Sequence, residues 1–170
     1  SVLANAPLDA GGTYESRLHG NPNDSVRAAV QVFSGIVQGC IAQSNGIFPD
    51  NYNELDEAEQ IEVISDLDGT LDISIFKDEL VYNTLKTIQV VKTIQSKNGA
   101  LGANRYIISN NQTALNVMQL YAMLKLVAFS DALTIDIVPL FETVTDLENA
   151  PKVMEQLYTN KAYKSHLKSR

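Results

Sequence analysis

Carboxylates stand at two places in the sequence where their spacing could support chemistry. Asp66 and Asp68 lie two residues apart in the stretch VISDLDGTLDIS, next to a Gly-Thr pair. Glu142 is the first polar residue past the largely apolar run Ile135–Leu140. A carboxylate can act as a nucleophile or a general acid, or it can hold a hard divalent cation through oxygen. The helices and strands that surround these carboxylates decide which of these roles each can take.

The spacing of apolar residues predicts a helical first half followed by strand, helix, strand and helix. Residues 1–24 are rich in Gly, Asn, Pro and Asp and show no period, so they are expected to be loop or disordered. Residues 25–170 are expected to form a single fragment of one domain. Helices are predicted from Ser25 to the Asn45-Gly46 stop, from Asp56 to Leu67, from Asp78 to Lys97, from Thr113, from a Thr145–Glu148 capping box through Leu157, and from Asn160 to Leu167.

The two predicted strands, 105–109 and 133–140, define the fold class. Strands joined by a crossover helix should be parallel and right-handed, and two strands are too few for an independent sheet. The sequence therefore predicts a predominantly helical α/β chain that is a slice of a larger body. If the strands are parallel, Ser109 and Asn110 end the first one on the same side as Glu142, where they either line a pocket or cap the next helix.

Composition narrows the class of protein. The chain of 170 residues is 45% hydrophobic and 19% charged, as in globular domains, and its net charge of −7 argues against nucleic acid or an anionic membrane as the main partner. No apolar run reaches the length of a membrane span. Cys40, the single cysteine, lies on an apolar stripe and is expected to be a buried structural thiol. A single cysteine cannot form an intrachain disulfide, which fits a reducing cytoplasm.

The stretch around Asp66 resembles the first motif of the haloacid dehalogenase-like phosphatases, D-x-D-G-T at the end of a strand. That resemblance implies Asp66 as nucleophile and Asp68 as acid and base, both holding Mg²⁺. The motif needs a buried strand before Asp66, whereas the preceding DEAEQIEVIS is acidic and has helical spacing. No later G-D-x-x-x-D completes a metal site, so the favoured interpretation is a turn between helices.

The second half of the chain resembles phosphoenolpyruvate carboxylase, in its bacterial branch. The resemblance rests on RYIISNNQTALNVMQLYAMLKL, on TIDIVPLFETVTDLENAPKVMEQL and on the lead-in DELVYNTLKTIQVVKTIQSKNGALGAN. It runs from about Asn51 to Arg170. The motif PLFET after an apolar strand and before D-L-x-x-A is highly specific, because an unrelated strand-loop-helix unit would not share such runs of consecutive residues.

This resemblance implies a slice of an enlarged (β/α)₈ TIM-type barrel with its active site at the carboxyl ends of parallel strands. It implies that Glu142 is a ligand of an essential Mg²⁺ or Mn²⁺, with Ser109 and Asn110 as possible pocket-lining residues. The implied reaction joins phosphoenolpyruvate and bicarbonate to give oxaloacetate and phosphate, which feeds the citric acid cycle. The implied assembly is a cytoplasmic homotetramer.

The resemblance also has gaps. The family's second metal carboxylate and its anion-binding loop would follow Arg170, and GNPNDS has Pro22 where the family's D-x-R-Q-x-S motif has arginine. The chain lacks an initiator Met and is expected to be a fragment from the middle of the enzyme; because the second metal carboxylate and the anion-binding loop are missing, the fragment is expected to be inactive. A non-catalytic helical module is a further alternative. His166 is expected on a helix surface, and His19 lies in the segment without a readable pattern.

Overall fold

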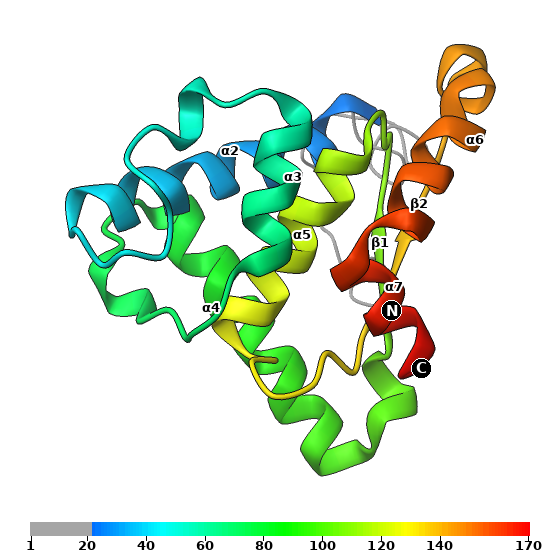
Figure 1. Ribbon diagram of the computed structural model, residues 1–170. Coiled ribbons are helices and arrows are strands. Elements are labelled where there is room, and N and C mark those ends of the chain that lie inside the picture. Colours follow the sequence, from blue (N-terminus) through cyan, green and yellow to red (C-terminus); the bar gives the residue numbers. More distant parts are fainter. Residues whose placement is uncertain (1–21) are drawn as a thin grey trace, which may run out of the picture.

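The computed structural model describes residues 22–170, with side chains from residue 26 onward. Figure 1 shows mostly helices around a short pair of strands. In chain order the elements are α2 (Pro22–Ala42), η2 (Tyr52–Glu54), α3 (Glu57–Asp66), η3 (Ile73–Ile75), α4 (Glu79–Asn98), η4 (Ala100–Ala103), β1 (Arg105–Ile108), α5 (Ala114–Val127), β2 (Asp136–Pro139), α6 (Val144–Thr159) and α7 (Lys161–Lys168).

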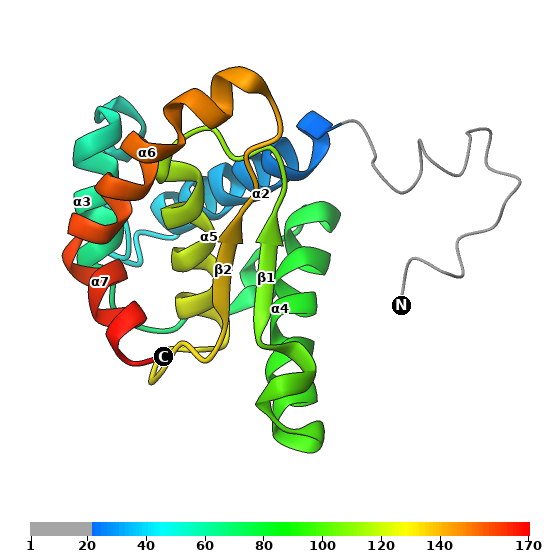
Figure 2. The ribbon, with the colours of Figure 1, turned by 90° about the vertical axis from the view of Figure 1, so that its right-hand side faces the viewer.

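The two strands pair in parallel, as the crossover helix between them predicts. The register places Arg105 opposite Asp136 and Ile108 opposite Pro139. Figure 2 shows both arrows running in the same direction, with α5 beside β2. Parallel pairing brings the carboxyl ends of β1 and β2 to one edge of the sheet, which is the edge that matters for Glu142.

One face of this small sheet is covered by helices and the other is open. Tyr106 and Ile108 line a cavity of about 210 Å³ together with residues of α2, α4 and α5. Ile107 points to the opposite face and is 54% exposed, although it is a large aliphatic residue in the middle of β1. The fold among residues 22–170 is therefore a predominantly helical α/β arrangement with one uncovered sheet face.

Helix α5 occupies the centre of the structure. The sequence predicts one apolar face on this helix, but nearly all of its sides are buried because α2, α3, α4, α6 and β2 all pack against it. A helix that is covered all round needs apolar residues all round. Its buried residues are Ala114, Val117, Met118, Gln119, Leu120, Tyr121, Ala122, Met123, Leu124, Leu126 and Val127.

Helix α2 packs closely on Phe76 and on the first turn of α4, through two glycines. A Cβ atom at Gly35 would lie 2.7 Å from the Cγ2 atom of Val81, and one at Gly39 would lie 2.4 Å from the Cε1 atom of Phe76. Both partners are buried. The approach of the two segments therefore depends on the missing side chains at Gly35 and Gly39, and it joins the helical front of the chain to the rest.

Several predicted helix ends are confirmed. Asp56 caps α3 and forms a capping box with Glu59, Asp78 caps α4, and Asn160 caps α7. Thr113 caps α5, so the alternative in which Ser109 or Asn110 caps that helix is wrong. At the C-terminal end of α4, Gly99 has a φ of +85°, a conformation that favours glycine.

Other boundaries differ from the prediction. Helix α2 already includes residues 22–24 and Ser25, so it begins before the predicted cap, and it ends at Ala42, before Asn45-Gly46. Earlier residues, including His19, lie outside the described range. The predicted Thr145–Glu148 capping box is wrong, because Thr143 and Asp146 form it, and α6 continues through Pro151 instead of restarting there.

The predicted apolar stripe of α4 is confirmed only in its middle. Leu85 and Ile88 are buried, but Leu80 is 42% and Ile94 37% exposed. The C-terminal part of this 20-residue helix extends past the elements that cover its centre (Figure 1), whereas Val81 in its first turn is buried. Cys40 is buried, as expected. Within residues 22–170, no helix combines the length and the apolar character needed to cross a bilayer.

Candidate functional site

Glu142 lies just past the carboxyl end of β2. The strand ends at Pro139, and the exposed side chain of Glu142 stands immediately before Thr143, the N-cap of α6. The Thr143 hydroxyl accepts a hydrogen bond from the amide of Asp146, and the Asp146 carboxylate accepts one from the amide of Thr143. The residue after Glu142 is thus held by the start of a helix, while the carboxylate itself is available.

The loop that follows β1 lies directly beside the Glu142 loop. The amide of Leu140 donates to the carbonyl of Ile108 at 2.9 Å, and the amide of Asn111 donates to the carbonyl of Leu140 at 2.8 Å. These two bonds continue the strand pairing beyond β1 and β2. Ser109 and Asn110 therefore lie at the same edge as Glu142, as predicted for parallel strands.

Asn110 and Asn111 are buried polar residues at this edge. Asn110 has a φ of +53°, in the left-handed region where asparagine is tolerated better than most residues. The side-chain nitrogen of Asn111 donates to the carbonyl of Thr113, but its side-chain oxygen Oδ1 has no hydrogen-bond partner among residues 22–170. Ser109 is half-buried. Sequence reasoning did not single out Asn111, although three consecutive polar residues after an apolar strand were a usable signal.

The donors at this edge suit a hard cation but do not complete a site for one. Mg²⁺ and Mn²⁺ prefer oxygen ligands, and Mg²⁺ is often held by one or two carboxylates with water and substrate. Among residues 22–170, no three or more His, Cys, Asp or Glu side chains are grouped so that they could hold a metal ion. Glu142 therefore fits the role of one ligand in a site that takes further oxygens from elsewhere.

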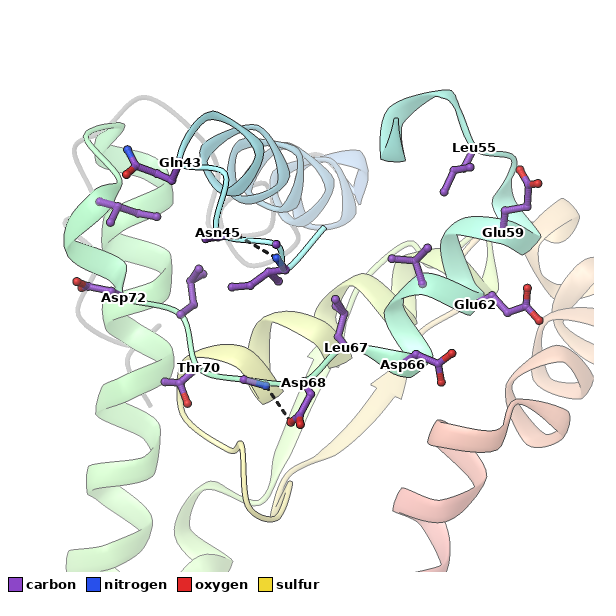
Figure 3. A pocket seen from close by; sticks show the side chains of 16 residues that line it. Gln43, Asn45, Leu55, Glu59, Glu62, Asp66, Leu67, Asp68, Thr70 and Asp72 are labelled. Carbon is purple, nitrogen blue, oxygen red and sulfur yellow. Dashed lines mark hydrogen bonds between the residues drawn. The ribbon is translucent and has the colours of Figure 1, made fainter. Parts of the chain in front are cut away.

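Asp66 and Asp68 line an open groove instead of ending a strand. Asp66 is the last residue of α3, and the Asp68 carboxylate accepts a hydrogen bond from the amide of Gly69 at 2.8 Å. Figure 3 shows the two carboxylates pointing in different directions. The phosphatase motif requires a buried strand before Asp66, and the structure has a helix there, so that alternative is not favoured.

The electrostatics of the groove agree with this conclusion. It has a volume of about 1070 Å³, and among residues 22–170 its lining includes no lysine or arginine. A phosphorylated substrate carries negative charge and would be repelled by the acidic lining of this groove. Asp66 also lines a second pocket, together with Lys125 and Lys161. The carboxylates around the groove are Glu59, Glu62, Asp66, Asp68 and Asp72.

His166 is buried, so its predicted place on the surface is wrong. It is 6% exposed and contacts the rings of Tyr121 and Tyr163, each with a centroid separation of 6.1 Å. Burial lowers the pKa of His166 below its usual value, and the nearby Asp136 carboxylate opposes this effect. Tyr163 and His166 are three residues apart on α7 and share one face. That spacing was the signal that sequence analysis overlooked.

Comparison with known proteins covers most of the described range. The family model described as phosphoenolpyruvate carboxylase matches residues 25–170. Curated proteins named phosphoenolpyruvate carboxylase are also similar. The protein of Synechococcus sp. is 31% identical over 120 residues, and that of Thermosynechococcus vestitus is 32% identical over 136 residues. No solved structure gives a significant match.

The chain belongs to the phosphoenolpyruvate carboxylase family. The match to the family model begins at residue 25. The resemblance noted from the sequence motifs runs only from about Asn51 to Arg170. The two alignments cover 66% and 73% of this chain but only 11% and 13% of the respective relatives. The chain thus spans about an eighth of the length of the curated relatives it matches.

Proposed function

We propose that this chain supplies part of the active site of a phosphoenolpyruvate carboxylase, with Glu142 as a ligand of Mg²⁺ or Mn²⁺. The observation that carries the proposal is the place of Glu142: exposed, at the carboxyl edge of two parallel strands, within the family-matched range. The reaction is the carboxylation of phosphoenolpyruvate by bicarbonate, which yields oxaloacetate and phosphate. The bound cation supplies stabilisation of the enolate that forms as phosphate leaves.

We propose further that β1 and β2 are two strands of an enlarged (β/α)₈ barrel. The uncovered sheet face supports this, since in a barrel one face of each strand meets the surrounding helices and the other packs inside. Ile107 is 54% exposed on the face away from α5 and would be buried in a barrel interior. Glu142 would then lie at the catalytic end of the barrel, with Ser109 and Asn110 lining the pocket beside it.

The contribution of this chain to the chemistry is binding and orientation. Glu142 holds the cation through a carboxylate oxygen, and the loops after β1 and β2 fix where that oxygen lies. A barrel active site uses groups from the ends of several strands. A single ligand from two strands does not make a complete site, so the chain by itself should not form oxaloacetate. In an assay with Mg²⁺ and bicarbonate, turnover near the enzyme-typical value of about 10 per second would contradict this.

The setting of the enzyme is proposed on the same basis. Family membership supports a homotetramer in the cytoplasm, and a single cysteine suits a reducing compartment. Family membership supports phosphoenolpyruvate and bicarbonate as the substrates, and the net charge of −7 argues against nucleic acid or an anionic membrane as a partner.

The test is Glu142→Gln in the full-length protein. The amide keeps the shape of the side chain but removes the charge. We expect the half-saturating Mg²⁺ concentration to rise and the rate to fall at least about 10²-fold, because metal stabilisation of the enolate is worth several kcal/mol. Glu148→Gln, a substitution at an exposed position of α6, is the matched control. The change in its rate should correspond to no more than about 0.5 kcal/mol relative to the parent. An unchanged Mg²⁺ requirement and rate in Glu142→Gln would refute the ligand role.

A further inference from the structure

Two hydrogen bonds join the loop after β1 to residues that precede and follow Glu142 in the chain. On its N-terminal side, the amide of Asn111 donates to the carbonyl of Leu140 at 2.8 Å. On its C-terminal side, the side-chain nitrogen Nδ2 of Asn149 donates to the carbonyl of Gln112 at 3.3 Å. The same short loop therefore holds the chain before and after the carboxylate.

The first of these bonds depends on the turn at the end of β1. Asn110 has left-handed backbone geometry, with a φ of +53°, and lies between the last bonded residue of the strand and Asn111. A single residue in this region changes the direction of the chain abruptly. This turn allows the amide of Asn111 to reach Leu140. Both asparagines are buried, which makes the loop a firm point of attachment.

The second bond is different because it comes from an exposed side chain. Asn149 lies on α6, one turn beyond Asp146 of the capping box, and it is exposed. No requirement of the core explains an asparagine here. Its amide joins α6 to residue Gln112, 37 positions earlier in the chain. The bond limits how far the start of α6, and with it the Glu142 loop, can tilt away from the neighbouring loop.

We propose that Asn149 is a positioning residue for Glu142. This inference rests on the proposed function, in which Glu142 is a metal ligand. A ligand on a free loop loses conformational entropy when it binds, and a ligand already held in place loses less. A supporting shell of hydrogen bonds is what usually fixes such a group to within about 0.5 Å. Asn149 acts through the loop and does not touch the cation.

The test uses Asn149→Leu in the full-length protein, with Mn²⁺ as the probe. Leucine has a similar size and no charge, but it cannot donate a hydrogen bond. Free Mn²⁺ is measured by electron paramagnetic resonance without substrate, so the result does not depend on turnover. We expect the Mn²⁺ dissociation constant to rise about 3- to 10-fold, the range expected for one net hydrogen bond. Asn149→Gln retains the amide donor and should recover part of the loss.

The matched control is Asn83→Leu, the same change at an exposed position on α4. It should leave the Mn²⁺ dissociation constant unchanged. An equal rise in Asn83→Leu and Asn149→Leu, or a rise that follows a loss of folded protein in thermal unfolding, would overturn the positioning role. Glu142→Gln is measured beside them: if it binds Mn²⁺ as the parent does, the ligand proposal itself fails. If only Glu142→Gln weakens binding, Glu142 remains a ligand and the inference about Asn149 is wrong.

Discussion

Thr143 and Asp146 bond to each other reciprocally at the start of α6, one residue after Glu142. The amide of Asp146 donates to the Thr143 hydroxyl at 3.1 Å, and the amide of Thr143 donates to the Asp146 carboxylate at 3.2 Å. Asp146 is buried in this arrangement. The capping box therefore begins the helix and also fixes the backbone that carries the proposed ligand.

Replacing Thr143 by alanine should destabilise the protein by about 1 to 2 kcal/mol, since a capping side chain of this kind is worth that much. Thr145→Ala is the matched control, because Thr145 is exposed inside α6 and caps nothing. Its free energy of unfolding should stay within about 0.5 kcal/mol of the parent. Urea denaturation of both variants measures the difference. Equal effects would mean that the cap at Thr143 contributes nothing to stability.

Gly39→Ala should also destabilise the protein. Its new methyl group would lie 2.4 Å from the Cε1 atom of the buried Phe76 ring, so the ring or α2 must shift. Overpacking of this kind costs about 1 to 3 kcal/mol, against a helix-propensity gain of up to about 1 kcal/mol. Gly102→Ala, whose Cβ atom would meet open space, is the control and should be close to neutral. A Gly39→Ala protein as stable as the parent in thermal unfolding would show that the packing of α2 is looser than described.

His166 should make stability depend on pH in a mildly acidic range. Burial lowers its pKa in the folded state below the model-peptide value of 6.5, while Asp136 raises it and Arg170 lowers it further. The unfolded state then binds more protons, so the stabilisation is complete above about pH 6.5 and is lost as the pH falls through the folded-state pKa. The hydrogen bond with Arg170 lowers the pKa of the Asp136 carboxylate below its usual value of 3.8, so the stability that Asp136 contributes is lost only at a more acidic pH, below that value.

The measurement for His166 is the free energy of unfolding at several pH values between about 8 and 5, in the parent and in His166→Phe. Phenylalanine keeps an aromatic ring against Tyr121 and Tyr163 but cannot titrate. We expect the parent to lose stability toward pH 5 and the variant to lose less. Identical slopes in the two proteins would contradict a lowered pKa at this position.

Asp66→Asn should have no effect on phosphate-ester chemistry, because there should be none to lose. Asp66 ends a helix, where the phosphatase motif requires the end of a buried strand. The assay is Mg²⁺-dependent hydrolysis of an activated phosphate ester by the parent and by Asp66→Asn. A rate above background that disappears in the variant would revive the phosphatase alternative, since an amide cannot form an acyl phosphate.

Local features of the chain were predictable because each depends on residues a few positions apart. The capping box of Asp56 and Glu59 needs one helical turn, and the stop at Gly99 needs only a residue that tolerates a positive φ. The parallel pairing followed from the order strand, helix, strand. The carboxyl-edge position of Glu142 followed from that pairing. The prediction of Thr145 as the N-cap of α6 was wrong because Thr143 and Thr145 are each followed three residues later by an acidic residue. The local sequence does not distinguish these two capping-box patterns.

Features that depend on distant segments were decided by the tertiary structure alone. His166 has the spacing of an ordinary surface helix, and it is buried because Tyr121, 45 positions earlier, packs against its ring. Helix α5 is enclosed by several elements whose placement no local pattern contains. In the sequence, Asn149 is one of several polar residues on α6, and only the fold brings its side chain within hydrogen-bond distance of the Gln112 carbonyl. Side-chain pattern sets what each segment can form, but burial and long-range bonding depend on which segments meet, and that is a property of the whole packed chain.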